Sequence, residues 1–400
     1  MKNKVAVGSS CVFIILLFME CHSQSINNIQ YKALENSIDS ILNSGDIVGF
    51  SACIVKEKEV VWSMVRGMAD VENKIPVNTN TVFILASLSK TVTGAALIKL
   101  YDKGLFALDD DINGYLPFKI RNPNFPNVPI TFRMLLTHTS SLNDNRDYIN
   151  ELYGPGDQRT ISLGDIIKNC FDTTGSHYVT QNFLKFKPGD KWRYCNSNYV
   201  LIAYLVEQIS EKPFSEYTKE NLFQPLDMNE TSWLFSDFDT THIAVNYDID
   251  TNDVNKNIRV CHYSWAGYPD GCLITSTPQF ASFIIMLMNQ GKYKGKQILK
   301  PEIVKEILTP QNVKIPPYKI IPPMLDMGLA WMVTESGSQM YFMHGGEGSG
   351  ITTLAFFDPI SKKGVIMFLT GIYLKETGEY AAKPKRYSSI LFNLFSNYLN

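Results

Sequence analysis

Ser87 and Lys90 form the only Ser-x-x-Lys pattern in the sequence. The residues that follow, 91–101, are typical of a helix, and a spacing of three places both side chains on one helix face, about 5–6 Å apart at Cβ. Ser87 would then lie at the helix N-terminus, where unpaired N–H groups favour a developing oxyanion. The same field, together with burial, would lower the pKa of Lys90, so that a neutral amine takes the serine proton. A helix-capping serine followed by a solvent-facing lysine is the alternative for this pattern taken alone.

Tyr194 and Asn196 form a second candidate pattern, because they follow a Pro-Gly-Asp turn and precede a helical stretch. A phenol beside an ammonium group can share its proton, and a carboxamide offers both a donor and an acceptor. The triplet Tyr-x-Asn also occurs at Tyr148 and Tyr398, so only the flanking turn and helix single out Tyr194.

A third candidate lies near the end of a predicted strand, where His344 is followed by Gly345, Gly346 and Glu347. Glycines at that place would let a substrate backbone approach closely, and the next amide could face a tetrahedral intermediate. A glycine-rich hairpin turn with an incidental histidine is the alternative.

Other common sites are absent from the sequence. It contains no Gly-x-Ser-x-Gly elbow, no His-Glu-x-x-His and no phosphate-binding loop. The six histidines have no metal-ligand spacing, which argues against a metal site. A strand pattern rather than a helix follows the glycine cluster at 345–350, which argues against dinucleotide binding.

Composition excludes further classes. The chain has 400 residues, 37 Lys and Arg against 39 Asp and Glu, and 12% aromatic residues. Its formal charge of −2 lacks the basic excess of a nucleic-acid binder, and its aromatic content is unlike that of disordered chains. A neutral globular protein of enzyme size with no nucleic-acid partner is therefore predicted.

Residues 1–23 have the pattern of a cleaved export signal. Lys2 and Lys4 precede a nine-residue apolar run at 11–19, and small residues at 21 and 23 suit a cut before Gln24. The run is too short to cross a bilayer, for which about 20 residues are needed. A periplasmic or secreted location is predicted, with membrane association only if Cys21 is lipidated instead.

Of the seven cysteines, five remain after the predicted cut. This is an odd number without a disulfide framework, so buried thiols with at most one or two bridges are expected.

The elements that must position these residues come from both chain ends. Strands are predicted at 50–55, 60–66, 340–343, 351–357 and 364–369, with helices at 27–42 and 387–398. The middle predicts helices at 88–101, 130–136, 198–209 and 279–290. Such an order indicates one sheet domain split by a helical insertion. The catalytic domain spans 24–400, with a sheet lobe at about 24–80 and 325–400 and a helical lobe at about 81–324.

The three motifs, in this order and at these separations, resemble the serine β-lactamase and D-alanyl-D-alanine carboxypeptidase superfamily. The nearest likeness is to its class C branch, which also holds D-aminopeptidases and esterases. Nearly the whole mature chain takes part, including residues 81–97, 104–117, 130–142, 214–232, 328–331 and 356–359. The resemblance implies an α+β fold with an antiparallel sheet, flanking terminal helices and a mostly helical inserted lobe.

The resemblance also implies a small-molecule or peptide substrate, a reaction that requires neither a metal nor an organic cofactor, and roles for the candidate residues. Ser87 would be the acylated nucleophile, Lys90 and Tyr194 would manage its proton, and Asn196 would orient Lys90 and the substrate carbonyl. His344 would replace the lysine of the lactamases' Lys-Thr-Gly motif, and the amides of Ser87 and Glu347 would form the oxyanion hole. Because a neutral imidazole holds a carboxylate less firmly than an ammonium group, the β-lactamase reading is weakened.

Two departures from the family pattern, Ser141 and Cys272 in place of glycines, are expected to alter loop or pocket shape. His138 is interpreted as a buried structural histidine rather than a catalytic one.

The leading hypothesis is an exported serine hydrolase acting on D-amino-acid peptides, peptidoglycan fragments or small esters. The alternatives are a true β-lactamase and a non-catalytic penicillin-binding sensor.

Overall fold

The computed structural model describes residues 30–42, 47–157, 161–250, 253–260, 262–313, 315–316, 323–371, 375–376, 379–380 and 383–399. The predicted export signal at 1–23 and Cys261 lie outside these residues. The chain divides into two units, Met1–Asp46 and Ile47–Asn400. In the first unit a helix covers residues 30–42, the described part of the helix predicted at 27–42.

The second unit is built on an eight-stranded sheet with the order β12-β13-β14-β15-β16-β1-β2-β3. Every described pairing in it is antiparallel. Runs rich in Val, Ile and Phe form its central strands, which suits a half-buried or fully buried pleated surface. The strands are β1 (Gly49–Lys56), β2 (Glu59–Asp70), β3 (Ile75–Pro76), β12 (Asp326–Met327), β13 (Met332–Ser336), β14 (Gln339–Gly348), β15 (Ile351–Asp358) and β16 (Lys363–Thr370).

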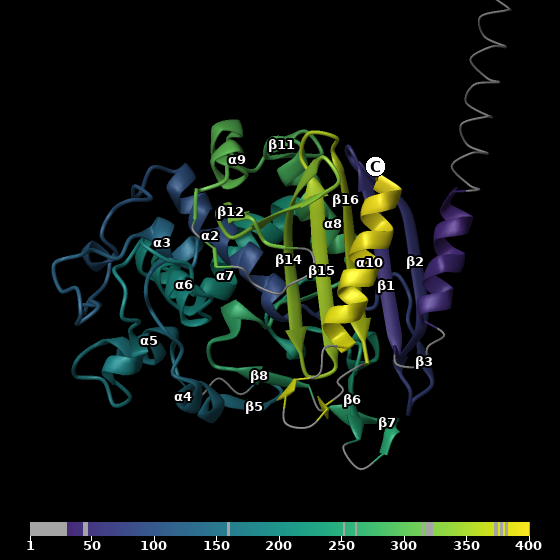
Figure 1. Cartoon of the computed structure of the whole chain (residues 1–400), viewed down its shortest axis with the longest axis horizontal. Coiled ribbons are helices and arrows are strands. Elements are labelled where there is room, and N and C mark those ends of the chain that lie inside the picture. The colour runs from purple at the N-terminus through teal and green to yellow at the C-terminus, as the bar shows by residue number, and fades with distance from the viewer. Residues whose placement is uncertain are drawn as a thin grey trace, which may run out of the picture. The chain divides into compact units, whose positions relative to one another are not determined.

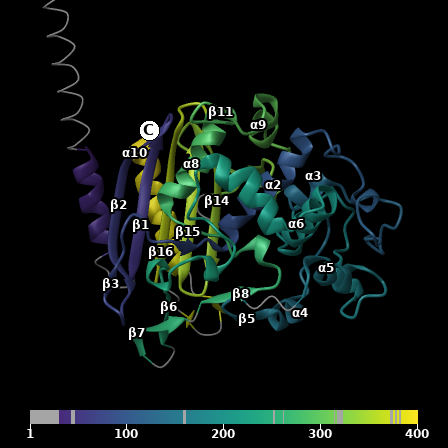
Figure 2. The same cartoon turned by 180° about the vertical axis from the view of Figure 1, so that it is seen from behind.

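Strands from the two chain ends meet in the middle of the sheet, where β1 pairs with β16 over its whole length. Helix α10 (Lys383–Leu399) covers one face and α8 (Thr277–Met288) covers the other (Figures 1 and 2). The ring of Phe392 on α10 lies 4.7 Å from that of Phe356 on β15. On the opposite face, Ser51 of β1 shares a 2.8 Å hydrogen bond with Thr277 at the start of α8. Thus α8, from the middle of the chain, completes the core of the sheet.

The middle of the chain supplies most of the helices. They are α2 (Ser89–Asp102), α3 (Phe132–Leu136), α4 (Arg146–Glu151), α5 (Leu163–Phe171), α6 (Ser197–Ser210), α7 (Phe214–Thr218) and α9 (Pro301–Ile307). Two-stranded ribbons join this region: β4 (Phe83–Ile84) with β9 (Ile274–Thr275), β5 (Tyr153–Pro155) with β8 (Tyr263–Trp265), β6 (Asn246–Asp250) with β7 (Asp253–Val260), and β10 (Lys292–Tyr293) with β11 (Lys296–Gln297). A further pair, β17 (Lys375–Glu376) with β18 (Glu379–Tyr380), precedes α10.

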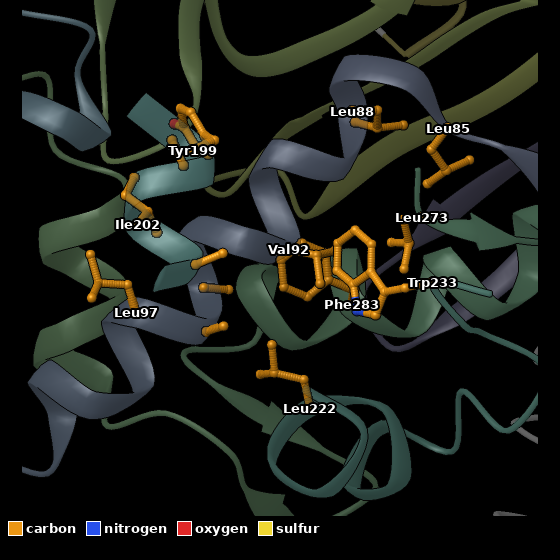
Figure 3. Packing of buried hydrophobic residues seen from close by; sticks show 14 of the residues in the cluster. Leu85, Leu88, Val92, Leu97, Tyr199, Ile202, Leu222, Trp233, Leu273 and Phe283 are labelled. Carbon is orange, nitrogen blue, oxygen red and sulfur yellow. The ribbon is translucent and has the colours of Figure 1, made fainter. Parts of the chain in front are cut away.

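Helix α2 is the central helix, and 12 of its 14 residues are buried. Its sequence is apolar or small on nearly every side, as expected for a helix surrounded by protein. A Cβ at Gly94 would lie 2.5 Å from the Cβ of Ala330, so a glycine there lets α2 approach the segment before β13. Figure 3 shows Leu85 and Leu88 flanking the turn before α2, with Val92 one turn further along the helix.

The predicted strands and helices are found in the described part of the chain, but β2 continues to Asp70 instead of ending at Arg66, and β14 differs more. That strand was expected to end at Met343, but it continues to Gly348 and contains the whole His-Gly-Gly-Glu motif. The four described cysteines outside the first unit, Cys53, Cys170, Cys195 and Cys272, are buried free thiols. In the part of the chain that the structure describes, no helix is long and apolar enough to cross a membrane.

Candidate active site

Ser87 lies in a single 3-10 turn, η1 (Ala86–Leu88), that leads directly into α2. The residue before the turn is held on both sides: the N–H of Leu85 donates to the carbonyl of Leu273 at 2.7 Å, and its carbonyl accepts from the Thr353 hydroxyl at 2.7 Å. Ala86 has a φ of 46°, in the left-handed region that a non-glycine residue adopts only under constraint. The position of Ser87 is therefore fixed by Leu273, just before β9, and by Thr353 of β15.

Lys90 is completely buried and lies one turn after Ser87. Its Nζ atom donates to Ser87 Oγ at 3.1 Å and to the carbonyl of Asp270 at 2.7 Å, and it lies 3.4 Å from Asp270 Oδ2. Burial alone would lower the pKa of Lys90, but the charge of Asp270, followed by Tyr194, outweighs burial and raises it. This corrects the expectation of a lowered pKa, which overlooked a buried carboxylate beside the amine.

Tyr194 comes to the same cluster from the loop before α6. Its phenol interacts with both Ser87 and Lys90, and Lys90 Nζ lies 5.2 Å from the centre of its ring. Burial raises the pKa of Tyr194, and the charge of Lys90 partly opposes that rise. The structure thus brings together Ser87, Lys90 and Tyr194, the three residues predicted to be catalytic.

Asp144 fixes the loop that carries Tyr194, and the sequence analysis missed it. Its carboxylate accepts from the N–H of Asn196 at 3.0 Å, from the N–H of Ser197 at 2.9 Å and from the Ser197 hydroxyl at 2.8 Å. These bonds satisfy free N–H groups at the start of α6 with a charge of the favourable sign. No hydrogen bond between the side chains of Asn196 and Lys90 is found among the described residues, and the orienting role of Asn196 stays a prediction.

His138 supports the same loop, as its structural interpretation predicts. Its Nδ1 accepts from the N–H of Cys195 at 3.2 Å, its carbonyl accepts from the N–H of Arg193 at 2.8 Å, and its ring lies 4.4 Å from that of Tyr194. Because Nδ1 accepts, the proton of the neutral ring is on Nε2, which is buried and has no hydrogen-bond partner within the described ranges. Burial, and then the charge of Lys90, keep the pKa of His138 well below its usual value.

The structure also explains how Ser141 can stand where the family pattern has a glycine. Ser141 has a φ of 62°, in the region where glycine is favoured, and its hydroxyl accepts from the Asn122 amide at 2.9 Å. The serine therefore keeps a backbone conformation suited to glycine, and a buried hydrogen bond supports it.

His344 lies inside β14 and is only 1% exposed. Its Nδ1 lies 2.7 Å from the carbonyl of Gly345 and must donate, because a carbonyl can only accept. The Nε2 atom is therefore an acceptor, and it is buried without a partner in the described structure. Burial, and then the charge of Lys90, lower the pKa of His344 to about 3, so the ring is neutral at physiological pH.

The two glycines after His344 differ in what they permit. A Cβ at Gly346 would lie 2.2 Å from the carbonyl oxygen of Leu85 and 3.0 Å from the amide nitrogen of Leu88, whereas a Cβ at Gly345 would meet nothing closer than 3.6 Å. Gly346 therefore lets β14 lie directly against the Ser87 turn, a different reason from the expected approach of a substrate. Glu347, next along the strand, is exposed and pairs with Thr352 of β15.

The buried imidazole of His344 predicts a pH-dependent loss of stability. Its folded-state pKa is about 3, whereas an unfolded histidine titrates near 6.5. Between these values the unfolded chain binds a proton that the folded chain does not, so stability falls as the pH is lowered. In urea unfolding, we expect the free energy of unfolding of the parental protein to fall by up to about 1.4 kcal/mol per pH unit because of His344. A His344→Gln variant should not show this part of the fall.

The matched control for this measurement is His242→Gln, because His242 is exposed. It should keep the parental dependence of stability on pH. An identical dependence in His344→Gln and the parental protein would contradict a buried, neutral His344.

Asp270 is the second residue that the sequence analysis missed. It lies at the end of the 3-10 turn η8 (Tyr268–Asp270), two residues before Cys272, the position predicted to alter the pocket. No local pattern marks it, since its partner Lys90 is 180 residues away in sequence. In the described residues no group of three or more His, Cys, Asp or Glu side chains is arranged to hold a metal ion.

The fold places Ser87 in the turn that leads into a buried helix and Lys90 one turn later, an arrangement suited to nucleophilic chemistry at the serine. A sequence profile described as Beta-lactamase matches residues 34–385. The chain therefore belongs to the beta-lactamase family, which confirms the predicted family and its α+β fold class.

Individual relatives are more distant. Protein flp of Staphylococcus aureus (strain NCTC 8325 / PS 47) is 24% identical over 388 residues, which cover 94% of this chain and 72% of flp. The octameric penicillin-binding protein homologue from Pyrococcus abyssi superposes with a TM-score of 0.72 at 22% identity, covering 90% of this chain and 77% of that one. D-amino acid amidase from Ochrobactrum anthropi SV3 gives a TM-score of 0.71 at 19% identity, covering 92% and 99%. The two solved structures show a shared fold.

Proposed function

We propose that this protein is an exported serine hydrolase that cleaves amide or ester bonds through an acyl-Ser87 intermediate. Its substrates would be D-amino-acid peptides, peptidoglycan fragments or small esters. The observation that carries the proposal is the 3.1 Å contact of Lys90 Nζ with Ser87 Oγ inside a buried cluster that also holds Tyr194. A hydroxyl held beside two groups able to exchange its proton is the arrangement that nucleophilic catalysis requires.

The proposed reaction has two steps. Ser87 Oγ attacks the substrate carbonyl while its proton passes to Lys90 or Tyr194, and the same group then protonates the leaving amine or alcohol. Water next attacks the acyl-serine, returning the proton to Ser87 and releasing the acid. The backbone amides of Ser87, in the turn before α2, and of Glu347 on β14 would stabilise the oxyanion.

The substrate class rests on two observations. D-amino acid amidase shares the fold over nearly its whole length, and the neutral His344 offers no positive charge for a β-lactam carboxylate. Export is proposed from the basic and apolar pattern of residues 1–23.

The proposal is tested by covalent labelling of the purified protein. It is incubated with a fluorophosphonate and, separately, with a fluorescent penicillin, and any adduct is located by mass spectrometry. We expect the fluorophosphonate adduct on Ser87 and none in a Ser87→Ala variant. A penicillin adduct that clears within seconds would favour a β-lactamase, and a lasting one would favour a carboxypeptidase-like enzyme. Failure of both probes to label Ser87 would overturn the proposed function.

A further inference from the structure

The loop that carries Asp270 is hydrogen-bonded to three side chains of α2. The Ser89 hydroxyl accepts from the N–H of Leu273 at 3.1 Å, the Thr93 hydroxyl donates to the carbonyl of Pro269 at 2.5 Å, and Lys90 donates to the carbonyl of Asp270 at 2.7 Å. Ser89, Lys90 and Thr93 are all completely buried. The Asp270 carboxylate is thus held at one position relative to Lys90.

The Asp270 carboxylate is itself buried and oriented. It belongs to a residue that is 5% exposed; its Oδ1 accepts from the indole N–H of Trp265 at 2.8 Å, and its Oδ2 lies 3.4 Å from Lys90 Nζ. A carboxylate and an ammonium group that are both buried at this distance stabilise each other's charged form. The side chain therefore does more than fill space beside the amine.

The remaining polar and titratable groups around Lys90 do not replace Asp270 as its counter-ion. Tyr194 and Tyr199 present phenol rings, and His138 and His344 are buried neutral imidazoles whose pKa values the charge of Lys90 lowers. Asp144 adds a further negative charge, but its oxygens are occupied by the start of α6. Asp270 is the carboxylate whose ion pair with Lys90 is found in the described structure.

We propose that Asp270 is a positioning residue of the catalytic site: it is the buried counter-ion of Lys90, and it sets the pH above which the site can accept the Ser87 proton. This inference rests on the proposed function and deepens it. Asp270 keeps Lys90 protonated in the resting site, so a proton must leave Lys90 or Tyr194 before the Ser87 hydroxyl can lose its own.

The direction of the effect is the same whichever group is the base. If Lys90 is the base, removal of the Asp270 charge lets burial lower the pKa of Lys90. If Tyr194 is the base, the same removal takes away a negative charge that adds to burial in raising the pKa of Tyr194. Either way, the base loses its proton at lower pH.

The test measures the rate of Ser87 labelling by the fluorophosphonate as a function of pH. We expect the midpoint at which labelling rises with pH to move down by about 1–3 pH units in Asp270→Asn, the usual effect of an adjacent opposite charge. Asp270→Ala should move it likewise while keeping the backbone carbonyl that binds Lys90, and Asp270→Glu should move it back toward the parental value. Asp147→Asn, which removes an exposed carboxylate on α4, should keep the parental midpoint. An unchanged midpoint in Asp270→Asn would overturn the inference, even if labelling were slower.

A second measurement does not depend on catalysis. In Asp270→Asn the pKa of the buried Lys90 should lie below that of an unfolded lysine, so the variant should lose stability as the pH falls from about 9.5 to 7. The double variant Lys90→Met/Asp270→Asn has neither charge and should not show this loss. A urea midpoint that changes equally with pH in both variants would overturn the proposed role of Asp270 as the counter-ion of Lys90. Failure of the parental protein to react with the fluorophosphonate would overturn only the proposed function.

Discussion

A Lys90→Met variant should acylate Ser87 about 10²- to 10⁴-fold more slowly than the parental protein, the range expected when a positioned proton-transfer group is removed. Methionine fills the space of the lysine stem, but it offers no group to donate to Ser87 Oγ or to exchange its proton. The rate of fluorophosphonate labelling is the appropriate measurement, because it reports attack by Ser87 on the probe without a contribution from deacylation.

This variant should still fold, because Asp270 can become neutral. The pKa of Asp270 is raised to about 6 mainly by burial, even though the charge of Lys90 lowers it. Without Lys90 the carboxyl group would therefore take up a proton near neutral pH. Lys103→Met, at the exposed end of the same helix, is the matched control and should label at the parental rate. Parental labelling by a folded Lys90→Met variant would rule out a proton-transfer role for Lys90.

The second large effect is expected for Tyr194→Phe. The phenylalanine ring should keep the tilted ring contact with His138, at 4.4 Å between ring centres, and the contact with Lys90 Nζ, at 5.2 Å, and lose only the phenolic oxygen. We expect acylation to slow by about 10²-fold or more, with a thermal unfolding temperature close to the parental one. The labelling rate, measured across the pH range beside that of Lys90→Met, compares the two groups directly.

Tyr148→Phe provides the control for Tyr194→Phe. Tyr148 begins the other described Tyr-x-Asn triplet, and its hydroxyl accepts from Asn169 on α5, away from Ser87. Its variant should keep the parental labelling rate. If Tyr194→Phe also labels at that rate, proton transfer involves Lys90 without Tyr194.

Local patterns were sufficient to locate part of the site in the sequence. The Ser87–Lys90 pair depends on one helical turn, so its spacing determines its geometry. Tyr194 could be selected because a turn and a helix flank it. The extent of β14 was underestimated because the glycines at 345 and 346 weaken a strand pattern, although contact with the Ser87 turn requires the second of them.

The residues that were missed act through contacts distant in sequence. Asp144 binds a loop 52 residues further on, and Asp270 binds Lys90 across 180 residues. Neither has a neighbouring residue that would mark its role, and the effect of Asp270 reverses the expected pKa change of Lys90. The protonation state of a buried lysine depends on which charges the fold places beside it, and a single sequence does not display that arrangement.

The separation of the partners around Ser87 also has a consequence for how the chain acquires activity. The turn before α2 is held by Leu273 and by Thr353, the latter 268 residues away, and Lys90 is held by Asp270. Contacts of such long range form late, because closing large loops costs entropy before any stabilising contact is made. Nucleophilic reactivity should therefore appear only at the last stage of folding, after the C-terminal strands have joined the sheet, and a partly synthesised chain would carry Ser87 as an ordinary unreactive serine.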